Sequence, residues 1–369
     1  HPRDRRQRQM CIRDSAIPPL GDVPLGNFPS SRSTTAPFME GAISNRSSLF
    51  AFHASFEVQQ LLGVLMETNT VVPLIGALGL VSLAISWHLR ESSSVRLAQI
   101  GWILVGIYFF VGAWNYQAKG DLILTVMSLL ALPLTIGLAR WESNVADIRA
   151  RKALNWSRGA MAYAGGPYLL IAHVPWLNVI AIWFVASQVA LFYRVSGTGD
   201  IQLGETWVET SSGKITWEEW DGNRWFSAET IGEFPFQTEL VMADGSFIGI
   251  NFVLACTALQ SMVIFIGAIA VLDLDWKRRI RAILFTIPVI HILNVFRNVG
   301  LIWMHQTYTT WSFYGMSVFE FGHNYAARFV SLFAMFFMAL IMFEILPELH
   351  RHIVRLLKPL GVMQPKKRI

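Results

Sequence analysis

Eight apolar runs, each close to the ~20 residues that a helix needs to cross a bilayer, constrain the fold of this chain more than any other feature. They lie at about 71–88, 97–116, 121–139, 158–174, 176–194, 252–272, 282–303 and 326–346. Charged residues are only 15% of the 369 residues, whereas soluble domains carry ~25%. The pattern predicts an all-α polytopic membrane protein with about seven to eight transmembrane helices in the cell membrane.

Composition divides the chain into five segments. Residues 1–50 lack periodicity and are expected to be disordered or artefactual, because residues 6–15 resemble a translated sequencing adapter. The next segments are N-terminal transmembrane helices with an outer interfacial helix (51–194), an acidic insert (195–249), the candidate catalytic helices (250–346) and a basic tail (347–369). Cys11 falls in the first segment, so we expect Cys256, the other cysteine, to have no disulfide partner.

The distribution of basic residues predicts the orientation. The linker 276–281 and the C-terminal tail are both rich in Lys and Arg, which places them on the cytoplasmic side. The segment ends that carry Cys256, Arg297 and His323 then lie at the extracytoplasmic face. The segment 140–158 is basic as well and is therefore also cytoplasmic. An odd number of crossings must then separate residue 158 from residue 250, which lies on the outer side. We therefore predict that 158–174 crosses the membrane, while 176–194 lies at the outer interface or re-enters, giving seven full spans.

The insert at 195–249 differs from the rest of the chain. It contains ten acidic residues but only Lys214 and Arg224 as bases. Alternating runs around Asp221-Gly222-Asn223 predict a small extracytoplasmic β-hairpin, with its tryptophans at the membrane surface. The chain's net charge of +5 comes from cations in short loops between apolar runs, so we expect no nucleic-acid partner.

Cys256 stands out because polar residues accompany it on an apolar segment. Thr257, Gln260 and Ser261 lie within about one helical turn of it. A lone cysteine is most often a small buried apolar residue. A thiol at a helix N-terminus with polar neighbours is instead a candidate nucleophile.

A second polar group lies in the run 282–303, where Asn294 and Asn298 flank Arg297. The arginine could simply extend to the interface. Alternatively, the asparagines could orient its guanidinium to stabilise a thiolate and a developing oxyanion. Charges within membrane segments are costly and are functional-site candidates by default.

The last apolar run begins with a third polar group, in which His323 and Asn324 precede Arg328. His323 is a candidate proton shuttle, and His291 and His305 are alternatives. One cysteine with scattered histidines gives no metal-ligand spacing, so we expect neither metal nor cofactor.

Together, Ala255-Cys256-Thr257-Ala258-Leu259-Gln260-Ser261-Met262, Asn294-Val295-Phe296-Arg297-Asn298 and His323-Asn324 through Arg328 resemble the archaeosortase/exosortase family, closest to its archaeosortase A group. The likeness covers roughly residues 70–346.

The resemblance implies an archaeal membrane cysteine transpeptidase that acts at the cell surface. Its substrates would be exported proteins, such as surface-layer glycoproteins, with a C-terminal sorting signal made of a Pro-Gly-Phe-type motif, a transmembrane helix and a basic tail. The enzyme would remove the signal and transfer the new C-terminus to a prenyl-type membrane lipid. Cys256 would be the nucleophile and Arg297 the first arginine. The third member is His or Arg in this family; both His323 and Arg328 are present here, and we prefer Arg328.

Two other classes compete with this reading. A transporter or channel could line its path with the arginines, and a scaffold would need no chemistry at all. We see no internal repeats or paired half-helices that would favour transport.

Overall fold

The computed structural model describes residues 71–89, 94–118, 121–225, 230 and 232–360; the predicted disorder of 1–50 lies outside them. The described chain is mostly helical, with a small antiparallel sheet. Six of its helices are long and apolar enough to cross a membrane: α2 (Val71–Leu89), α3 (Ser94–Ala118), α4 (Leu122–Asn144), α6 (Pro175–Val195), α8 (Trp276–Thr307) and α10 (Ala327–Ile345). The prediction of a polytopic helical membrane protein is confirmed at this level.

The helices differ from the predicted spans at two runs. The run 158–174 lies in α5 (Ile148–His173), which is long enough but too polar to join the six. The run 252–272 is divided between a strand, a short turn and α7 (Leu259–Ala270), whose 12 residues are too few to cross. The run 176–194 forms α6, which is long and apolar enough to span; its predicted position at the outer interface, or as a re-entrant segment, stays a prediction.

A buried ion pair explains how α5 tolerates a cation inside the bundle. Arg158 Nε donates to Glu142 Oε1 of α4 at 2.7 Å, and Arg158 Nη1 donates to Ser86 Oγ of α2 at 3.1 Å. Trp102 of α3 also donates to Glu142, at 3.3 Å. A buried charge persists only when it is paired and hydrogen-bonded, and this network satisfies both partners while joining α2, α3, α4 and α5.

The insert forms a four-stranded antiparallel sheet of order β2-β1-β3-β4, rather than a single hairpin. Its strands are β1 (Ile201–Thr210), β2 (Gly213–Thr216), β3 (Phe236–Met242) and β4 (Phe247–Phe252). The first hairpin turns between Thr210 and Gly213, which face each other in the register. Gly213 has a φ of +120°, a conformation that glycine adopts without steric cost. The sheet therefore extends three residues past the predicted insert boundary at 249.

The predicted hairpin at Asp221-Gly222-Asn223 is wrong, because residues 217–225 form a compact loop around aromatic rings. Trp217 and Trp220 are only 5% and 4% exposed and belong to the main core. Arg224 lies over the Trp217 ring, 5.1 Å from its centroid, and donates to the carbonyls of Trp217, Glu218 and Trp220. Of the tryptophans predicted at the surface, these two are buried and Trp225 is 65% exposed.

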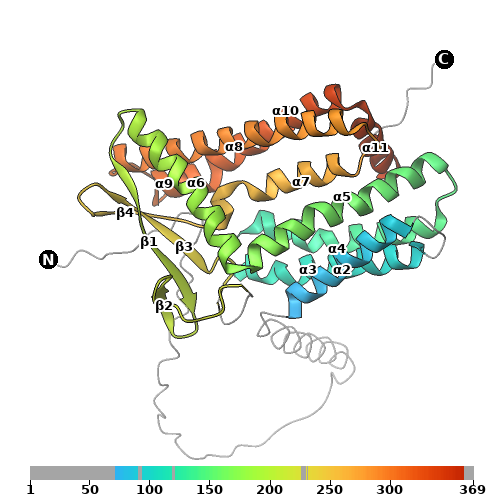
Figure 1. Ribbon diagram of the computed structural model, residues 1–369, viewed down its shortest axis with the longest axis horizontal. Coiled ribbons are helices and arrows are strands. Elements are labelled where there is room, and N and C mark those ends of the chain that lie inside the picture. The colour runs from blue at the N-terminus through green and yellow to red at the C-terminus, as the bar shows by residue number, and fades with distance from the viewer. Residues whose placement is uncertain (1–70, 90–93, 119–120, 226–229, 231, 361–369) are drawn as a thin grey trace, which may run out of the picture.

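The remaining elements complete the bundle. They are a 3-10 turn η1 (Leu254–Thr257), the short α9 (Val318–Phe321), the π-helical turn η2 (Gly322–Ala326), a two-stranded ribbon of β5 (Ser312–Phe313) and β6 (Met316–Ser317), α11 (Pro347–Leu357) and η3 (Lys358–Leu360). The sheet lies at one end of the bundle and α11 at the other, with α7 between α5 and α8 (Figure 1). The predicted tail at 347 thus begins as a helix.

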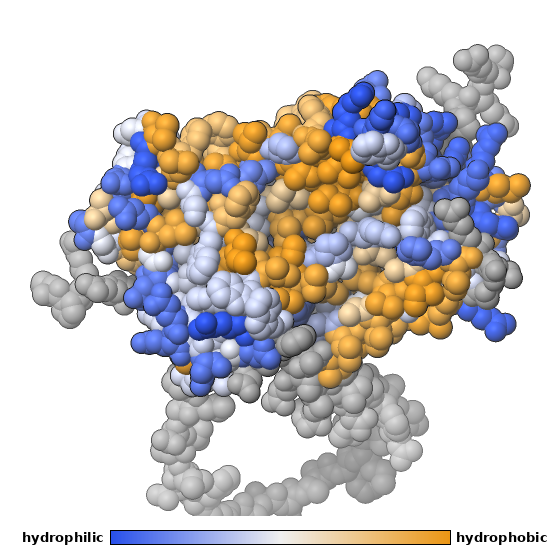
Figure 2. Space-filling model, viewed as in Figure 1, coloured by the Kyte–Doolittle hydropathy of each residue, from blue (hydrophilic) through white to orange (hydrophobic). Residues whose placement is uncertain are grey.

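Surface hydropathy also changes along the bundle, from the sheet at one end to α11 at the other. Figure 2 shows apolar residues over much of the helical surface, and hydrophilic residues gathered at the sheet end and near α11. Large apolar side chains are exposed on the outer faces of the helices, including Leu284, Phe329 and Leu332. This is the distribution that a surrounding bilayer requires.

Candidate functional site

Cys256 lies in η1, between the end of β4 and the start of α7. Its side chain is fully buried, in the core shared by α6, the sheet and α8. It does not begin a membrane-length helix, as the sequence suggested. Ala258 separates η1 from α7 with a φ of +56° and a ψ of +15°, a left-handed conformation that is unfavourable for residues with a Cβ. The chain therefore changes direction sharply just after Cys256.

Two asparagines of α8 hold the backbone of Cys256 in place. Asn294 Nδ2 and Asn298 Nδ2 donate to the Cys256 carbonyl oxygen at 2.8 and 3.0 Å. The two residues are one turn apart, so their side chains share one face of the helix. Both asparagines were expected to orient the Arg297 guanidinium, but within the described residues only Asn298 hydrogen-bonds to it, accepting from Arg297 Nη1 at 3.3 Å. Their main role here is to fix Cys256 against α8.

The prediction that Cys256 has no disulfide partner is wrong for this structure, in which Cys256 is disulfide-bonded. That prediction discounted Cys11, the chain's only other cysteine, which lies outside the described residues. Any nucleophilic chemistry therefore belongs to the reduced form of Cys256.

Arg297 projects from α8 beside the residues that hold Cys256. It is partly buried, and its Nε atom is buried with no hydrogen-bond partner among the described residues. A buried donor left unsatisfied costs about 1–3 kcal/mol. A bound group with an oxygen acceptor would remove that cost, which is what an oxyanion or a carbonyl of a substrate supplies.

His323 lies in the π-helical turn before α10 and stacks on Phe319, with ring centroids 5.7 Å apart. Its pKa is lowered from 6.5 to about 4, mainly by burial and further by the charges of Arg297 and Arg328. Its Nδ1 is buried without a hydrogen-bond partner in the described part of the chain. The imidazole is therefore neutral at neutral pH, so in the predicted role of proton shuttle it starts as the proton acceptor, and its low pKa makes the imidazolium give the proton up readily.

Arg328 is an exposed member of the predicted site. Its Nη2 donates to Asp121 Oδ2 at 2.6 Å, and the side chains are 42% and 16% exposed. Asp121 is also the N-cap of α4, where its Oδ1 accepts from the Leu124 backbone N–H. Sequence reasoning missed Asp121 because an aspartate before an apolar run is typical of an ordinary helix start.

Two of the other predicted residues, Thr257 and Gln260, support the local structure. Thr257 Oγ1 donates to the Leu254 carbonyl at 2.7 Å and accepts from the Leu259 N–H, so it stabilises η1 and the start of α7. Gln260 is exposed and donates to the Tyr168 hydroxyl of α5 at 2.7 Å. Asn324 lies in the π-helical turn with His323.

The two alternative histidines are engaged elsewhere. His291 interacts with Gln188 Oε1 of α6 at 2.7 Å, and His305 with the Ile248 carbonyl of β4 at 3.2 Å. The charges of Arg297 and Arg328 both act on His323. Among the described residues, no group of three His, Cys, Asp or Glu side chains could hold a metal ion.

Asn294 and Asn298 therefore join the Cys256 backbone to α8, Arg297 donates to one of these asparagines, and the charges of Arg297 and Arg328 act on His323. No family model, curated protein or solved structure matches the chain. The likeness to archaeosortases and exosortases stays a prediction from the three motifs.

Proposed function

We propose that the chain is a membrane cysteine transpeptidase of the archaeosortase/exosortase kind, acting through the reduced form of Cys256. The observation that carries the proposal is the double hydrogen bond from Asn294 and Asn298 to the Cys256 carbonyl, which fixes the cysteine backbone to the part of α8 that carries Arg297. Catalytic side chains need this kind of rigid support to hold a productive geometry.

In the first half-reaction, His323 accepts the thiol proton and Cys256 Sγ bonds to the carbonyl carbon of the scissile peptide bond. Arg297 donates to the resulting oxyanion. The C–N bond then breaks, and the leaving amine takes the proton from His323. The product is a thioester between Cys256 and the new C-terminus.

In the second half-reaction, a hydroxyl or amine of a membrane lipid attacks the thioester. Its proton passes to His323 as the new C–O or C–N bond forms and the C–S bond breaks, and it then returns to the Cys256 sulfur. Arg328, held by Asp121, contributes positive charge near His323 and keeps its imidazole neutral between the two steps.

The substrate would present its cleavage motif at the extracytoplasmic face and a basic tail in the cytoplasm, as the resemblance implies. In this orientation the sheet lies outside the cell, and α11 with the C-terminus lies in the cytoplasm. The acceptor would be a prenyl-type lipid.

The test uses the full chain in proteoliposomes of archaeal-type lipid with dithiothreitol, a dithiol that reduces the disulfide. The substrate is a reporter ending in Pro-Gly-Phe, an apolar helix and a basic tail. We expect a product that lacks the tail and gains a lipid mass, and no product from Cys256→Ala or without the reductant. Equal processing by Cys256→Ala would overturn the proposal and favour a transporter or scaffold.

A further inference from the structure

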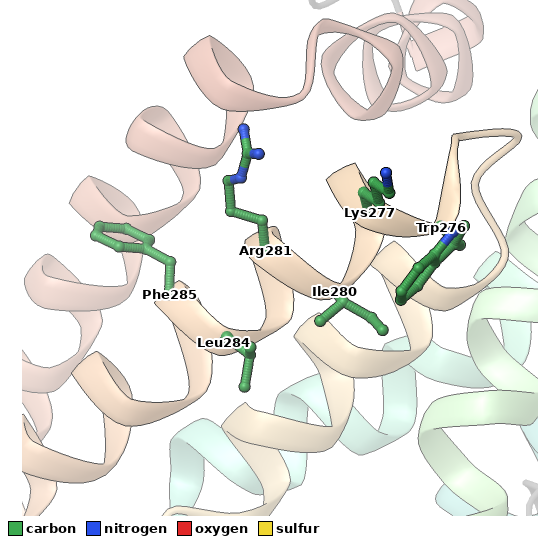
Figure 3. Close-up of a pocket in the computed structure, with 6 residues that line it drawn as sticks. All are labelled: Trp276, Lys277, Ile280, Arg281, Leu284 and Phe285. Carbon is green, nitrogen blue, oxygen red and sulfur yellow. The ribbon is translucent and has the colours of Figure 1, made fainter.

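A patch on α8, near the end of the bundle that carries α11, combines charge and apolar surface in a defined order. Two rows of side chains lie side by side there, each spaced by four residues. One row is Trp276, Ile280 and Leu284, and the other is Lys277, Arg281 and Phe285. Figure 3 shows these six side chains on the successive first turns of the helix, with Arg281 extending towards the neighbouring helix. We call this surface the α8 patch.

The cations of the α8 patch differ from their neighbours in having no acidic partner. Arg278 pairs with Glu348 at 3.3 Å, and Arg279 donates to the Leu272 carbonyl at 2.7 Å. Within the described part of the chain, no ion pair joins Lys277 or Arg281 to an acidic side chain. Asp275 is used as the helix N-cap, accepting from the Lys277 backbone N–H.

The apolar side chains continue from the cations towards the middle of the helix. Trp276 and Leu284 are 60% and 66% exposed, and Ile280 and Phe285 are each 43% exposed. From residue 276 to residue 285 the helix rises about 13 Å, enough for a headgroup region and the first part of an acyl chain. Trp276 stands beside the cations, and tryptophan is enriched at the level of lipid headgroups.

We propose that the α8 patch binds one anionic phospholipid, whose phosphate contacts Lys277 and Arg281 and whose acyl chain lies along Ile280, Leu284 and Phe285. The order of cations followed by apolar side chains matches the order of groups in such a lipid, and basic residues next to the cytoplasmic end of a membrane helix attract anionic headgroups. Lys277 and Arg281 each precede one of the clamping asparagines by about 17 residues, or about 25 Å along the helix. The patch is therefore separate from the Cys256 site, and the proposal does not rest on the transpeptidase function.

The test measures lipid binding by the delipidated full chain in a neutral detergent. Native mass spectrometry would count bound dioleoyl phosphatidylglycerol and, separately, dioleoyl phosphatidylcholine. We expect one phosphatidylglycerol to bind at least tenfold more tightly than phosphatidylcholine. Lys277→Gln and Arg281→Gln should each weaken its binding about fivefold. The paired change Ile280→Ser/Leu284→Ser should weaken the binding of phosphatidylglycerol, although it leaves the charge of the patch unchanged.

The matched control is Arg355→Gln/Lys358→Gln, which removes two cations from the same end of the molecule and should leave this binding unchanged. An equal loss in the control would show that general attraction to positive charge explains the binding, and would overturn the proposal. Competition by inorganic phosphate that removes the lipid equally well, with no effect of the serine pair, would show a phosphate site instead and would also overturn it.

Discussion

Arg328 and Asp121 are 207 residues apart in the sequence, yet their side chains form a 2.6 Å ion pair between α10 and the start of α4. The pair joins the N-terminal helices to the helix that carries one of the candidate site arginines. Asp121 serves two roles at once, because one carboxylate oxygen caps α4 and the other accepts from Arg328.

The two roles of Asp121 can be separated by Asp121→Asn, since asparagine caps helices about as well as aspartate but carries no charge. We expect this variant to lose about 0.5–1 kcal/mol of unfolding free energy, the usual value for a partly exposed pair. Thermal unfolding in detergent would measure it. In a double-mutant cycle with Arg328→Gln, the second change should add almost nothing.

The control for this cycle is Asp147→Asn, which alters the N-cap of α5, where the carboxylate accepts from the Arg149 N–H at 3.0 Å. No ion pair of Asp147 occurs among the described residues. Asp147→Asn should therefore lose less unfolding free energy than Asp121→Asn. If Asp121→Asn and Arg328→Gln prove fully additive, the ion pair contributes nothing to stability.

The ion pair between Asp121 and Arg328 also predicts that the stability of the fold depends on pH in the acid range. Burial raises the pKa of Asp121, but hydrogen bonds from Arg328 and the Leu124 N–H, with the charge of Arg328, outweigh it and hold the pKa below 3.8. A lowered carboxyl pKa stabilises the folded state above 3.8, and this contribution is lost as the pH falls through the folded-state pKa. Wild type and Asp121→Asn should therefore converge in stability only in strong acid.

The two hydrogen bonds that Asn294 and Asn298 donate to the Cys256 carbonyl predict that removing both costs more unfolding free energy than the sum of the two single changes. The Cys256 carbonyl accepts two hydrogen bonds, so removing one donor leaves it satisfied, whereas removing both leaves it buried and unpaired. We expect Asn294→Leu to cost about 1 kcal/mol and the double Leu variant about 3 kcal/mol or more. Asn298→Leu should cost more than Asn294→Leu, because Asn298 also accepts from Arg297. Thermal unfolding of the three variants decides between this and simple addition.

The residues of the candidate site could be selected from the sequence because polar residues in apolar segments are rare and costly. Cys256, Asn294, Asn298, Arg297 and His323 were all found in this way. The structure brings the first three into direct contact and places His323 in the field of Arg297. The role of the asparagines was not predictable, because a side-chain donor can reach either a neighbouring guanidinium or a backbone carbonyl, and spacing alone does not distinguish them.

The fold around Cys256 was harder to predict for a different reason. The run 252–272 has uniform apolarity, and hydropathy does not separate a buried strand end from a helix. The structure ends β4 at Phe252 and begins α7 only at Leu259. Similarly, the turn dipeptide Asp221-Gly222 indicated a hairpin, but burial of Trp217 and Trp220 determined the conformation of that loop.

His323 predicts a loss of stability between pH 6.5 and about 4. Its folded-state pKa of about 4 is lower than the ordinary 6.5, because burial and the charges of Arg297 and Arg328 disfavour the imidazolium. In that interval the unfolded chain binds a proton that the folded chain does not, so the unfolding free energy falls as the pH falls. The contribution is up to about 3 kcal/mol, present above pH 6.5 and gone near pH 4. His323→Asn should flatten the melting temperature across this interval, and an undiminished slope in that variant would assign the dependence to other groups.

The last prediction concerns Ala258, whose left-handed backbone follows Cys256 and Thr257. An alanine in this conformation carries a strain of about 1–2 kcal/mol, which glycine does not. Ala258→Gly should therefore raise the unfolding free energy by a few tenths to about 1 kcal/mol, since the extra freedom of glycine in the unfolded chain offsets part of the gain. Ala258→Val should lower it, because a β-branched residue fits that conformation worse. Thermal unfolding of the two variants against Ala255→Gly, a matched change three residues earlier within η1, isolates the backbone effect. Should Ala258→Gly and Ala255→Gly both destabilise by similar amounts, the left-handed turn stores no strain. Stabilisation by Ala258→Gly alone would show that the chain retains a strained residue next to its candidate nucleophile, as proteins do where a site requires a fixed geometry.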